Sequence, residues 1–298
     1  MNLCNEKRDL MREPSPINLE NSVILLREIP MLPEVAIEAL NVARDPDSSM
    51  RDLAKVIERD ASLSVGVLRL VNSPLYRISH TIETVDQAVV RLGMRECQNL
   101  IITVSMRSLF RKIPASRRQR CETLWRHGIM TATLCRRLNE ELALGFQGQE
   151  FAGGLCHDIG RILLAFGAPA HCDFADPLDF NEPPDLLTRE EQVLGTDHCR
   201  FGAWYSNLNE LPEALTIPIL YHHKPSESNG LTSLVTLVAV ADKLANASHR
   251  GESPDLEAIL AELHVQENQF EELLHGEKLS AIMDKTVAET DGAVGFTK

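Results

Sequence analysis

Apolar residues in this chain recur at the three- and four-residue spacing of an α-helix, and no long stretch alternates apolar with polar residues. The spacing is clear at Leu63, Val67, Leu70 and Val71, and it returns at Leu256, Ile259, Leu260 and Leu263. Because an α-helix turns once every 3.6 residues, this spacing gathers apolar side chains on one face. A half-buried β-strand needs a period of two instead. We therefore predict an all-α fold without internal repeats.

Local signals place several helix ends. Ser49 and Asp52 form a Ser-x-x-Asp pattern that predicts a helix start before the run RDLAKVIER. Thr84 and Gln87 predict a second start, and Gly93 is expected to end that helix. Ser253-Pro254 predicts an N-cap followed by proline at the first helical position.

The chain divides by composition into several parts. We expect a flexible lead-in at residues 1–17, which are polar and contain prolines, and one main domain at 18–250. Within it, 18–110 reads as a series of short helices, and 111–250 holds most of the histidines. Residues 169–185, rich in Pro and Asp, are predicted to form an exposed loop. Residues 251–298 are expected to add C-terminal helices that pack on the second part, followed by a frayed tail.

The charge balance restricts the partners of the chain. Carboxylates outnumber lysines and arginines by 43 to 30, for a net charge of −13, which excludes a general nucleic-acid binder. Nine cationic side chains and one carboxylate lie between Ser105 and Arg137, so that stretch carries +8 and the remainder −21. Two interpretations stay open. The stretch is either a solvated helix face that pairs with acidic groups, or a surface for an anion or an acidic partner.

Cysteine usage and hydropathy indicate a compartment. The seven cysteines are odd in number and contain no Cys-x-x-Cys pair, which favours reduced thiols over a disulfide framework. The N-terminal sixteen residues lack the apolar core of a signal peptide, and the most apolar segment, Leu231 to Ala241, is too short to span a bilayer. We expect a soluble cytoplasmic protein with no membrane partner.

Seven side chains of metal-binding type are candidates for a functional site. They are His127, His157, Asp158, His198, His222, His223 and Asp242. Asp242 lies in an apolar helix, where a carboxylate needs a partner: the adjacent Lys243, a buried histidine or a metal ion. Imidazoles and carboxylates together suit first-row transition metals, and seven such groups can hold two metals that share one carboxylate. The long spacings require assembly from separate helices.

The remaining histidines and two cysteines have a simpler interpretation. We assign His80, His171, His249, His264 and His275 to ordinary core or surface positions. Cys156 and Cys199 each adjoin a candidate ligand and could bind metal as thiolates, but a buried small apolar role is favoured.

The stretch GGLCHDIGRILLAF resembles the His-Asp motif of the HD superfamily of metal-dependent phosphohydrolases. The chain from about 20 to 250 is similar to one branch in particular, the HDOD domain, an HD-related output domain of bacterial signalling proteins. The resemblance rests on LPEVAIEALNVA, LAKVIERDASLSVGVLRLVNSPLY, TVDQAVVRLGMRECQNLI, LWRHGIMTATLCRRL, EEQVLGTDHCRFGAWYSNLNELPEALTIPILYHHKP and LVAVADKLA. Because it leaves only short ends, we expect one module without a second functional domain.

The resemblance implies an N-terminal helical subdomain followed by an HD-like helical bundle. It also implies that the seven candidate side chains are metal ligands, with Asp158 and Arg161 in the catalytic positions of the hydrolases. Two features depart from the HD-GYP phosphodiesterases. Arg161 stands where those enzymes have a lysine near the substrate phosphate. The Gly-Tyr-Pro segment is absent, since KPSESNG follows His223.

Two functional hypotheses follow. The first is a bacterial signal-transduction module that binds signalling proteins in trans, with or without a bound metal. The second is a metal-dependent phosphohydrolase or phosphodiesterase that uses the retained His/Asp site, with a phosphate-containing small ligand as substrate. The expected cofactors are one or two divalent transition metal ions, Fe, Mn, Ni or Zn.

Overall fold

The computed structural model describes residues 31–73, 80–109, 115–265, 270–273 and 277–296, and these contain helices and no strand. The predicted lead-in at 1–17 lies outside the described residues. The α-helices are α3 (Glu34–Arg44), α4 (Met50–Glu58), α5 (Ala61–Val71), α6 (Val85–Leu109), α7 (Arg118–Glu141), α8 (Gln149–Cys156), α9 (Ile159–Gly167), α10 (Pro169–Ala175), α11 (Leu186–Leu194), α12 (His198–Leu208), α13 (Glu213–Tyr221), α14 (Thr232–Arg250), α15 (Leu256–Glu262) and α16 (Glu277–Phe296). Single 3₁₀ turns form at Ala115–Arg117, Pro225–Glu227 and Glu271–Leu273. The predicted all-α fold is confirmed.

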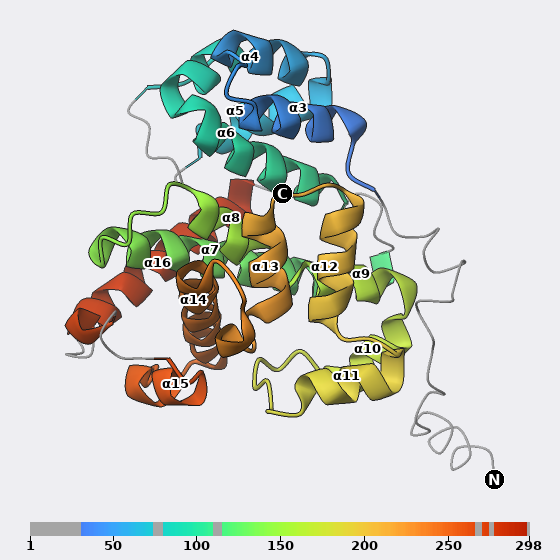
Figure 1. The fold of residues 1–298 in the computed structure, drawn as a ribbon, viewed down its shortest axis with the longest axis vertical. Coiled ribbons are helices and arrows are strands. Elements are labelled where there is room, and N and C mark those ends of the chain that lie inside the picture. The colour runs from blue at the N-terminus through green and yellow to red at the C-terminus, as the bar shows by residue number, and fades with distance from the viewer. Residues whose placement is uncertain (1–30, 74–79, 110–114, 266–269, 274–276, 297–298) are drawn as a thin grey trace.

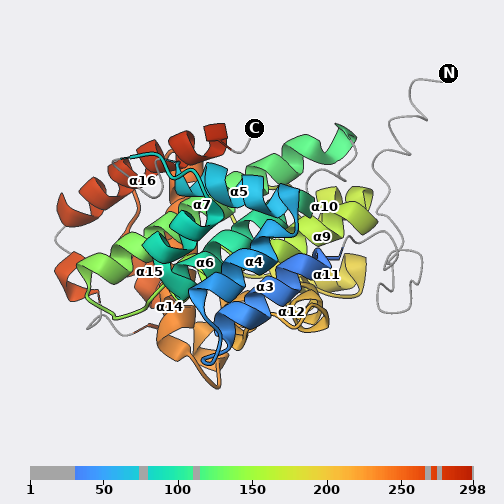
Figure 2. The same ribbon diagram turned by 90° about the horizontal axis from the view of Figure 1, so that it is seen from above.

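The helices form two groups (Figure 1). In the first, α6 packs against α3, α4 and α5. In the second, the long helix α7 packs against α8, α14 and α16, and α12 packs against α9 and α13. Figure 2, seen from above, shows the first group lying over the second. This order matches the expected N-terminal helical subdomain followed by a helical bundle, while the exact domain boundaries stay predictions.

A shared apolar core joins the two groups. One cluster of buried side chains runs from Leu32, Leu53 and Ile101 in the first group to Phe151 and Leu163 in the second. A second cluster joins α7 and α14 to α15 and α16, with Leu134, Leu244, Leu260 and Ile282 among its members. The helices that carry or adjoin the candidate ligands therefore belong to these clusters: α8, α9, α12 and α13 to the first, α14 to the second and α7 to both.

Helix ends follow the predicted caps at two of three places. Ser49 accepts a hydrogen bond from the backbone N–H of Asp52, whose side chain accepts one from the backbone N–H of Ser49. Thr84 accepts from the Gln87 backbone N–H at 3.2 Å, directly before α6 begins. Gly93 has φ +78° and interrupts α6, as expected for a residue that ends a helical segment.

Two local predictions were wrong. Asp255, not Ser253, caps α15 and accepts from the Ala258 backbone N–H, since a carboxylate suits a helix N-terminus. Residues 169–185 are not an exposed loop throughout: α10 occupies 169–175, and Asp176 and Glu182 are buried. The reason is that both carboxylates pair with the buried Arg161.

None of the described helices combines the length and the apolarity needed to cross a bilayer. Among the same residues the six cysteines Cys97, Cys121, Cys135, Cys156, Cys172 and Cys199 are all buried with free thiols.

Candidate metal centre

The seven candidate side chains come from separate helices and meet in the second group. His127 lies in the middle of α7, His198 begins α12 and Asp242 lies in α14. His157 and Asp158 occupy the junction between α8 and α9, and His222 and His223 directly follow α13. All are buried except His223, which is partly exposed.

Glycines allow the ligand-bearing helices to approach closely. A Cβ atom at Gly160 in α9 would overlap the carbonyl oxygen of His198 at the start of α12. A Cβ at Gly154 in α8 would lie 2.9 Å from the Cα of Ala132 in α7. Side chains at these two positions would push apart the backbones that carry the candidate ligands.

The first set of donor atoms surrounds His127. Its Nε2 lies 3.0 Å from Oδ1 of Asp242 and 3.3 Å from Nε2 of His157. Oδ2 of Asp158 completes this set, 3.8 Å from the same atom of His127 and 3.6 Å from Nε2 of His157. Two nitrogen ligands of one tetrahedral metal ion lie about 3.3 Å apart, so these separations have the scale of a coordination sphere.

The second set of donor atoms surrounds His198. Its Nε2 lies 3.4 Å from Nε2 of His222 and 3.2 Å from Nε2 of His223. Oδ1 of Asp158 lies 3.5 Å from Nε2 of His198 and 3.7 Å from Nε2 of His222. The two oxygens of Asp158 thus face different sets. This is the arrangement expected of a carboxylate shared by two metals.

The hydrogen bonds of three rings direct Nε2 lone pairs into the centre. Nδ1 of His157 contacts the Gly154 carbonyl oxygen at 2.7 Å, and Nδ1 of His222 contacts the Pro218 carbonyl oxygen at 3.1 Å. Nδ1 of His198 contacts Oε2 of Glu190 at 2.7 Å. Since a neutral imidazole carries one proton, donation from Nδ1 leaves each Nε2 as an acceptor. Acceptors facing one another need positive charge between them, and a metal cation fits.

Electrostatics in the centre also favours a cation. Oδ1 of Asp158 is buried without a hydrogen-bond partner among the described residues. Burial opposes ionisation of Asp158, but the Arg161 guanidinium and the imidazoles hold the pKa of its carboxyl well below the usual range. Burial likewise lowers the pKa of His198, and Cys199 and Glu190 reverse this and raise it well above its usual value. The site attracts positive charge, whether as protons or as metal ions.

Arg161 is held by carboxylates on every side. Its Nη1 donates to Asp158 at 2.8 Å and to Glu182 at 2.9 Å, while Nη2 donates to Asp176 at 2.8 Å. Arg161 is 2% exposed. These contacts favour a positioning role toward Asp158, because no face of the group is left for a substrate phosphate. The catalytic role of Asp158 and Arg161 stays a prediction.

Several residues around the centre carry no signal of their own in the sequence. Glu190 accepts from both the backbone N–H and Nδ1–H of His198. Asn246 donates to Oδ1 of Asp242 at 3.1 Å, and Glu182 accepts from Asn246 at 2.9 Å. Glu190 begins EEQVLGTDHC, a segment on which the HDOD resemblance rests, and lies eight residues before His198. This position is the sequence signal that could have marked Glu190. Groups of this kind orient metal ligands and tune their affinity.

Two residues assigned to ordinary roles, Cys199 and His249, lie beside the centre, and Cys199 groups with His198, His222 and His223 within 4.8 Å, a set that could hold a metal ion. Sγ of Cys199 lies 4.0 Å from Nδ1 of His222, the nitrogen that faces backbone carbonyls. His249 stacks on Phe180 with ring centroids 4.2 Å apart, and its ring lies 5.4 Å from that of His127. Burial and the neighbouring His127 lower the pKa of His249 to about 3.

Four arginines of the cationic stretch form ion pairs within the chain. Arg120 contacts Asp173 and Asp176, and Arg136 contacts Glu96 at 3.2 Å. Arg126 and Arg137 bind Asp291 and Glu289 of α16, respectively. These pairs support the interpretation of a helix face that meets acidic groups of the same chain.

The chain is similar to known proteins in both sequence and fold. The family model of the HDOD domain matches residues 29–225. A solved HDOD domain protein with unknown function from Geobacter sulfurreducens is 25% identical, with a TM-score of 0.71 over 94% of this chain and 99% of that one. The protein named "putative phosphohydrolase" from Shewanella amazonensis SB2B has the same TM-score at 23% identity, covers 93% of this chain and 99% of its own, and is similar in fold.

A relative found by sequence matches most of this chain but less than half of its own length. An uncharacterized protein of Treponema pallidum (strain Nichols) is 25% identical over 218 residues, which is 72% of this chain. The matched part spans only 42% of that relative's length.

Proposed function

The chain belongs to the HDOD family, and from that premise we propose that it is a bacterial signal-transduction module with a buried metal centre. In this proposal the seven His and Asp side chains hold one or two divalent transition metal ions. The module acts in the cytoplasm through contact with signalling proteins supplied in trans. The bound metal fixes the packing of α7, α9, α12 and α14, and with it the surface that partners meet.

Burial of the centre is the observation that carries this proposal. His127, His157 and His198 are 0% exposed, and His222 and Asp242 are 1% exposed. Metal sites that serve structure are closed, whereas catalytic sites keep an open coordination position. Arg161, the one guanidinium beside Asp158 among the described residues, is already bound by three carboxylates. Both features favour a regulatory module over an enzyme.

Metal content and turnover, measured on one preparation, test the proposal. Elemental analysis of the purified chain is expected to find Fe, Mn, Ni or Zn, and Asp158→Ala is expected to lose it. The same preparation, supplied with Mn, Fe, Ni or Mg, is expected not to hydrolyse p-nitrophenyl phosphate or bis-p-nitrophenyl phosphate. Absence of metal from the wild-type chain contradicts the metal centre, and robust turnover contradicts the regulatory role.

Affinity capture tests the partner. The wild-type chain and Asp158→Ala are each used as bait in extracts of the source cells, and a partner bound by the metal-organised surface is expected to be enriched by the wild type alone. Equal recovery by both baits, or recovery of background proteins only, contradicts action through such a surface.

A second candidate function rests on the completeness of the ligand set. Both donor sets are intact, and Asp158 faces each with one oxygen. A two-metal site supplies Lewis-acid activation of water and of a phosphoryl oxygen, which is the chemistry of a metal-dependent phosphohydrolase. In that function the seven His and Asp side chains would hold the ions, with Asp158 common to both donor sets and oriented by Arg161, and a phosphate-containing ligand would enter from the side of the partly exposed His223. Turnover that is lost in Asp158→Ala establishes this candidate.

A further inference from the structure

Cys199 lies against the second donor set and is not one of the seven candidate ligands. It is the second residue of α12, directly after His198, and is 2% exposed. Its Sγ groups with donor atoms of His198, His222 and His223, and all four atoms lie within 4.8 Å of one another. Among the described residues, no other cysteine belongs to a group of this kind.

The other five described cysteines are part of the apolar core. Cys97, Cys121, Cys156 and Cys172 belong to the first apolar cluster, and Cys135 belongs to the second. Cys199 belongs to neither cluster, although it is equally buried. Its Sγ lies 4.0 Å from a ring nitrogen of His222 instead. The apolar role expected for Cys156 and Cys199 therefore fits Cys156 and does not fit Cys199.

The four side chains can meet at one tetrahedral ion. Bonds of about 2.3 Å to sulfur and about 2.0 Å to nitrogen hold a sulfur and a nitrogen about 3.5 Å apart on such an ion. The nitrogens already have this scale, because Nε2 of His198 lies 3.4 Å and 3.2 Å from Nε2 of His222 and of His223. Sγ of Cys199 lies on the Nδ1 side of the His222 ring. To reach the same ion it needs a rotation about one torsion, Cα–Cβ, which leaves the backbone of α12 in place.

Charge gives the second set a reason to use the thiol. The first set contains two carboxylates, those of Asp158 and Asp242. The second set has three imidazoles, which are neutral when they bind a metal, and it shares only Oδ1 of Asp158. A buried divalent cation needs anionic ligands, because uncompensated charge is costly in a low-dielectric interior. A metal ion deprotonates a thiol that coordinates it, so Cys199 can supply this negative charge.

We propose that Cys199 is a thiolate ligand of the ion held by His198, His222 and His223, and that it makes this position selective for Zn²⁺. Thiolates are soft ligands that favour Zn²⁺ over the harder ions Mn²⁺ and Mg²⁺. The first set has only nitrogen and oxygen donors and lacks this preference. The inference rests on the metal centre proposed above, and it adds a ligand and a metal identity to that centre.

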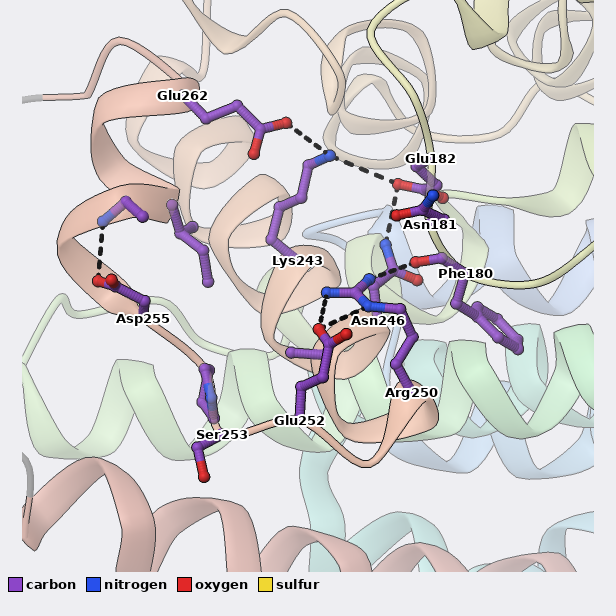
Figure 3. A pocket seen from close by; sticks show the side chains of 14 residues that line it. Phe180, Asn181, Glu182, Lys243, Asn246, Arg250, Glu252, Ser253, Asp255 and Glu262 are labelled. Carbon is purple, nitrogen blue, oxygen red and sulfur yellow. Dashed lines mark hydrogen bonds and ion pairs between the residues drawn. The ribbon is translucent and has the colours of Figure 1, made fainter.

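An acidic pocket beside the centre is the alternative place for an added metal ion. It has a volume of about 320 Å³ and lies between α14, α15 and the segment at 180–182 (Figure 3). Figure 3 shows Lys243 between Glu182 and Glu262, and Arg250 against Glu252, so these carboxylates already have partners. The described residues that line the pocket contain no sulfur, so an ion bound there has no thiolate ligand.

Cobalt spectroscopy tests the thiolate. Co²⁺ can replace Zn²⁺ in a tetrahedral site, where a cysteine ligand adds a sulfur-to-metal charge-transfer band in the near ultraviolet. The full chain, freed of metal by a chelator and kept reduced, is expected to show this band when Co²⁺ is added. Cys199→Ala and Cys199→Ser are expected to bind Co²⁺ without the band. Cys156→Ala, which changes the buried cysteine beside His157, and Glu262→Gln, which changes the acidic pocket, are expected to keep the band.

The outcomes separate the thiolate from the metal centre. Co²⁺ binding by the wild type without the band overturns the thiolate ligand, and so does a band that persists in Cys199→Ala. Equal loss of the band in Cys156→Ala also overturns it, because the loss then does not depend on Cys199. If the wild type binds neither Co²⁺ nor Zn²⁺, the metal centre itself is contradicted, and the thiolate ligand with it.

Competition with a chelator of known affinity measures the selectivity. Cys199→Ala is expected to lower the overall affinity for Zn²⁺ about tenfold or more, at least the loss caused by removing a group that only orients a ligand. Its affinity for Mn²⁺ is expected to change by less than about threefold, because a hard ion gains little from a soft thiolate. Cys156→Ala is expected to change neither affinity. An equal fall for both metals in Cys199→Ala shows a packing role instead and overturns the selectivity.

Discussion

At the scale of single residues, the ligands depend on neighbours that hold their rings. Glu190 is the clearest of these, because one of its oxygens accepts from both the backbone N–H and the ring Nδ1–H of His198 at 2.9 Å and 2.7 Å. The negative charge of Glu190 also makes Nε2 of His198 a stronger donor to a metal.

Glu190→Gln keeps the shape of the side chain but removes its negative charge. We therefore predict that this substitution lowers metal affinity about 10- to 100-fold. Competition of the purified variant with a metal chelator of known affinity measures the change. Glu191→Gln is the matched control, since Glu191 is exposed and pairs with Arg200 instead. If the two variants bind metal equally well, the orienting role of Glu190 is wrong.

The same scale shows what could be predicted from sequence. The seven candidate ligands could be named because their types and the HDOD resemblance mark them, and the structure brings their donor atoms together. Glu182 and Asn246 could not be named, since their contact joins positions 64 residues apart and depends on how α14 meets the 180–182 segment. A charged or amide side chain gives no sign of such a contact until the helices are in place.

At the scale of helices, glycines set the distances between ligand-bearing backbones. Gly160 in α9 faces the carbonyl oxygen of His198 without room for a methyl group. We predict that Gly160→Ala forces α9 and α12 apart and lowers the free energy of unfolding by about 1–3 kcal/mol, the usual cost of overpacking.

Urea unfolding followed by circular dichroism measures this loss, and metal analysis should show reduced occupancy because Asp158 and His198 move apart. Gly230→Ala serves as the control, because a Cβ there would meet only Cδ1 of Ile217 at 4.0 Å. A Gly160→Ala protein as stable and as metal-loaded as Gly230→Ala contradicts this role.

The N-cap of α4 stabilises a helix that carries none of the candidate metal ligands. Ser49 and Asp52 exchange hydrogen bonds at the start of the helix. Ser49→Ala is therefore expected to lower the free energy of unfolding by about 1 kcal/mol and to leave the metal content unchanged. Chemical denaturation and elemental analysis of one preparation measure both. Loss of metal from Ser49→Ala would show that α4 supports the centre directly.

Helix ends were predictable where a short-range cap decides them, as at Ser49 and Thr84. The interpretation of 169–185 failed because a distant contact decides it. Its Pro and Asp content is typical of an exposed loop, yet Asp176 and Glu182 are buried by their ion pairs with Arg161. A buried guanidinium needs carboxylates around it, and the chain supplies them from this segment.

At the scale of the whole molecule, a continuous core connects the metal centre to helices that hold none of its ligands. The apolar cluster that includes Leu53 and Ile101 of the first helix group also includes Leu163 of α9, which follows Asp158. Stabilisation of the candidate metal centre should therefore reach α3 to α6 through packed side chains.

Metal removal tests this connection. A metal that binds only the folded chain, at 100 times its dissociation constant, adds about 2.7 kcal/mol to the free energy of unfolding. For a chain of 298 residues, we expect chelation to lower the thermal midpoint by about 4 °C. Far-ultraviolet circular dichroism reports on all helices, and the fluorescence of Trp125 and Trp204 reports on α7 and α12. The thermal midpoints measured by the two signals should fall by the same amount. The Asp158→Ala protein should start from a lower midpoint and not respond to the chelator. A fall in fluorescence midpoint alone would mean that the first helix group unfolds independently of the centre, and the core would then not transmit the bound state.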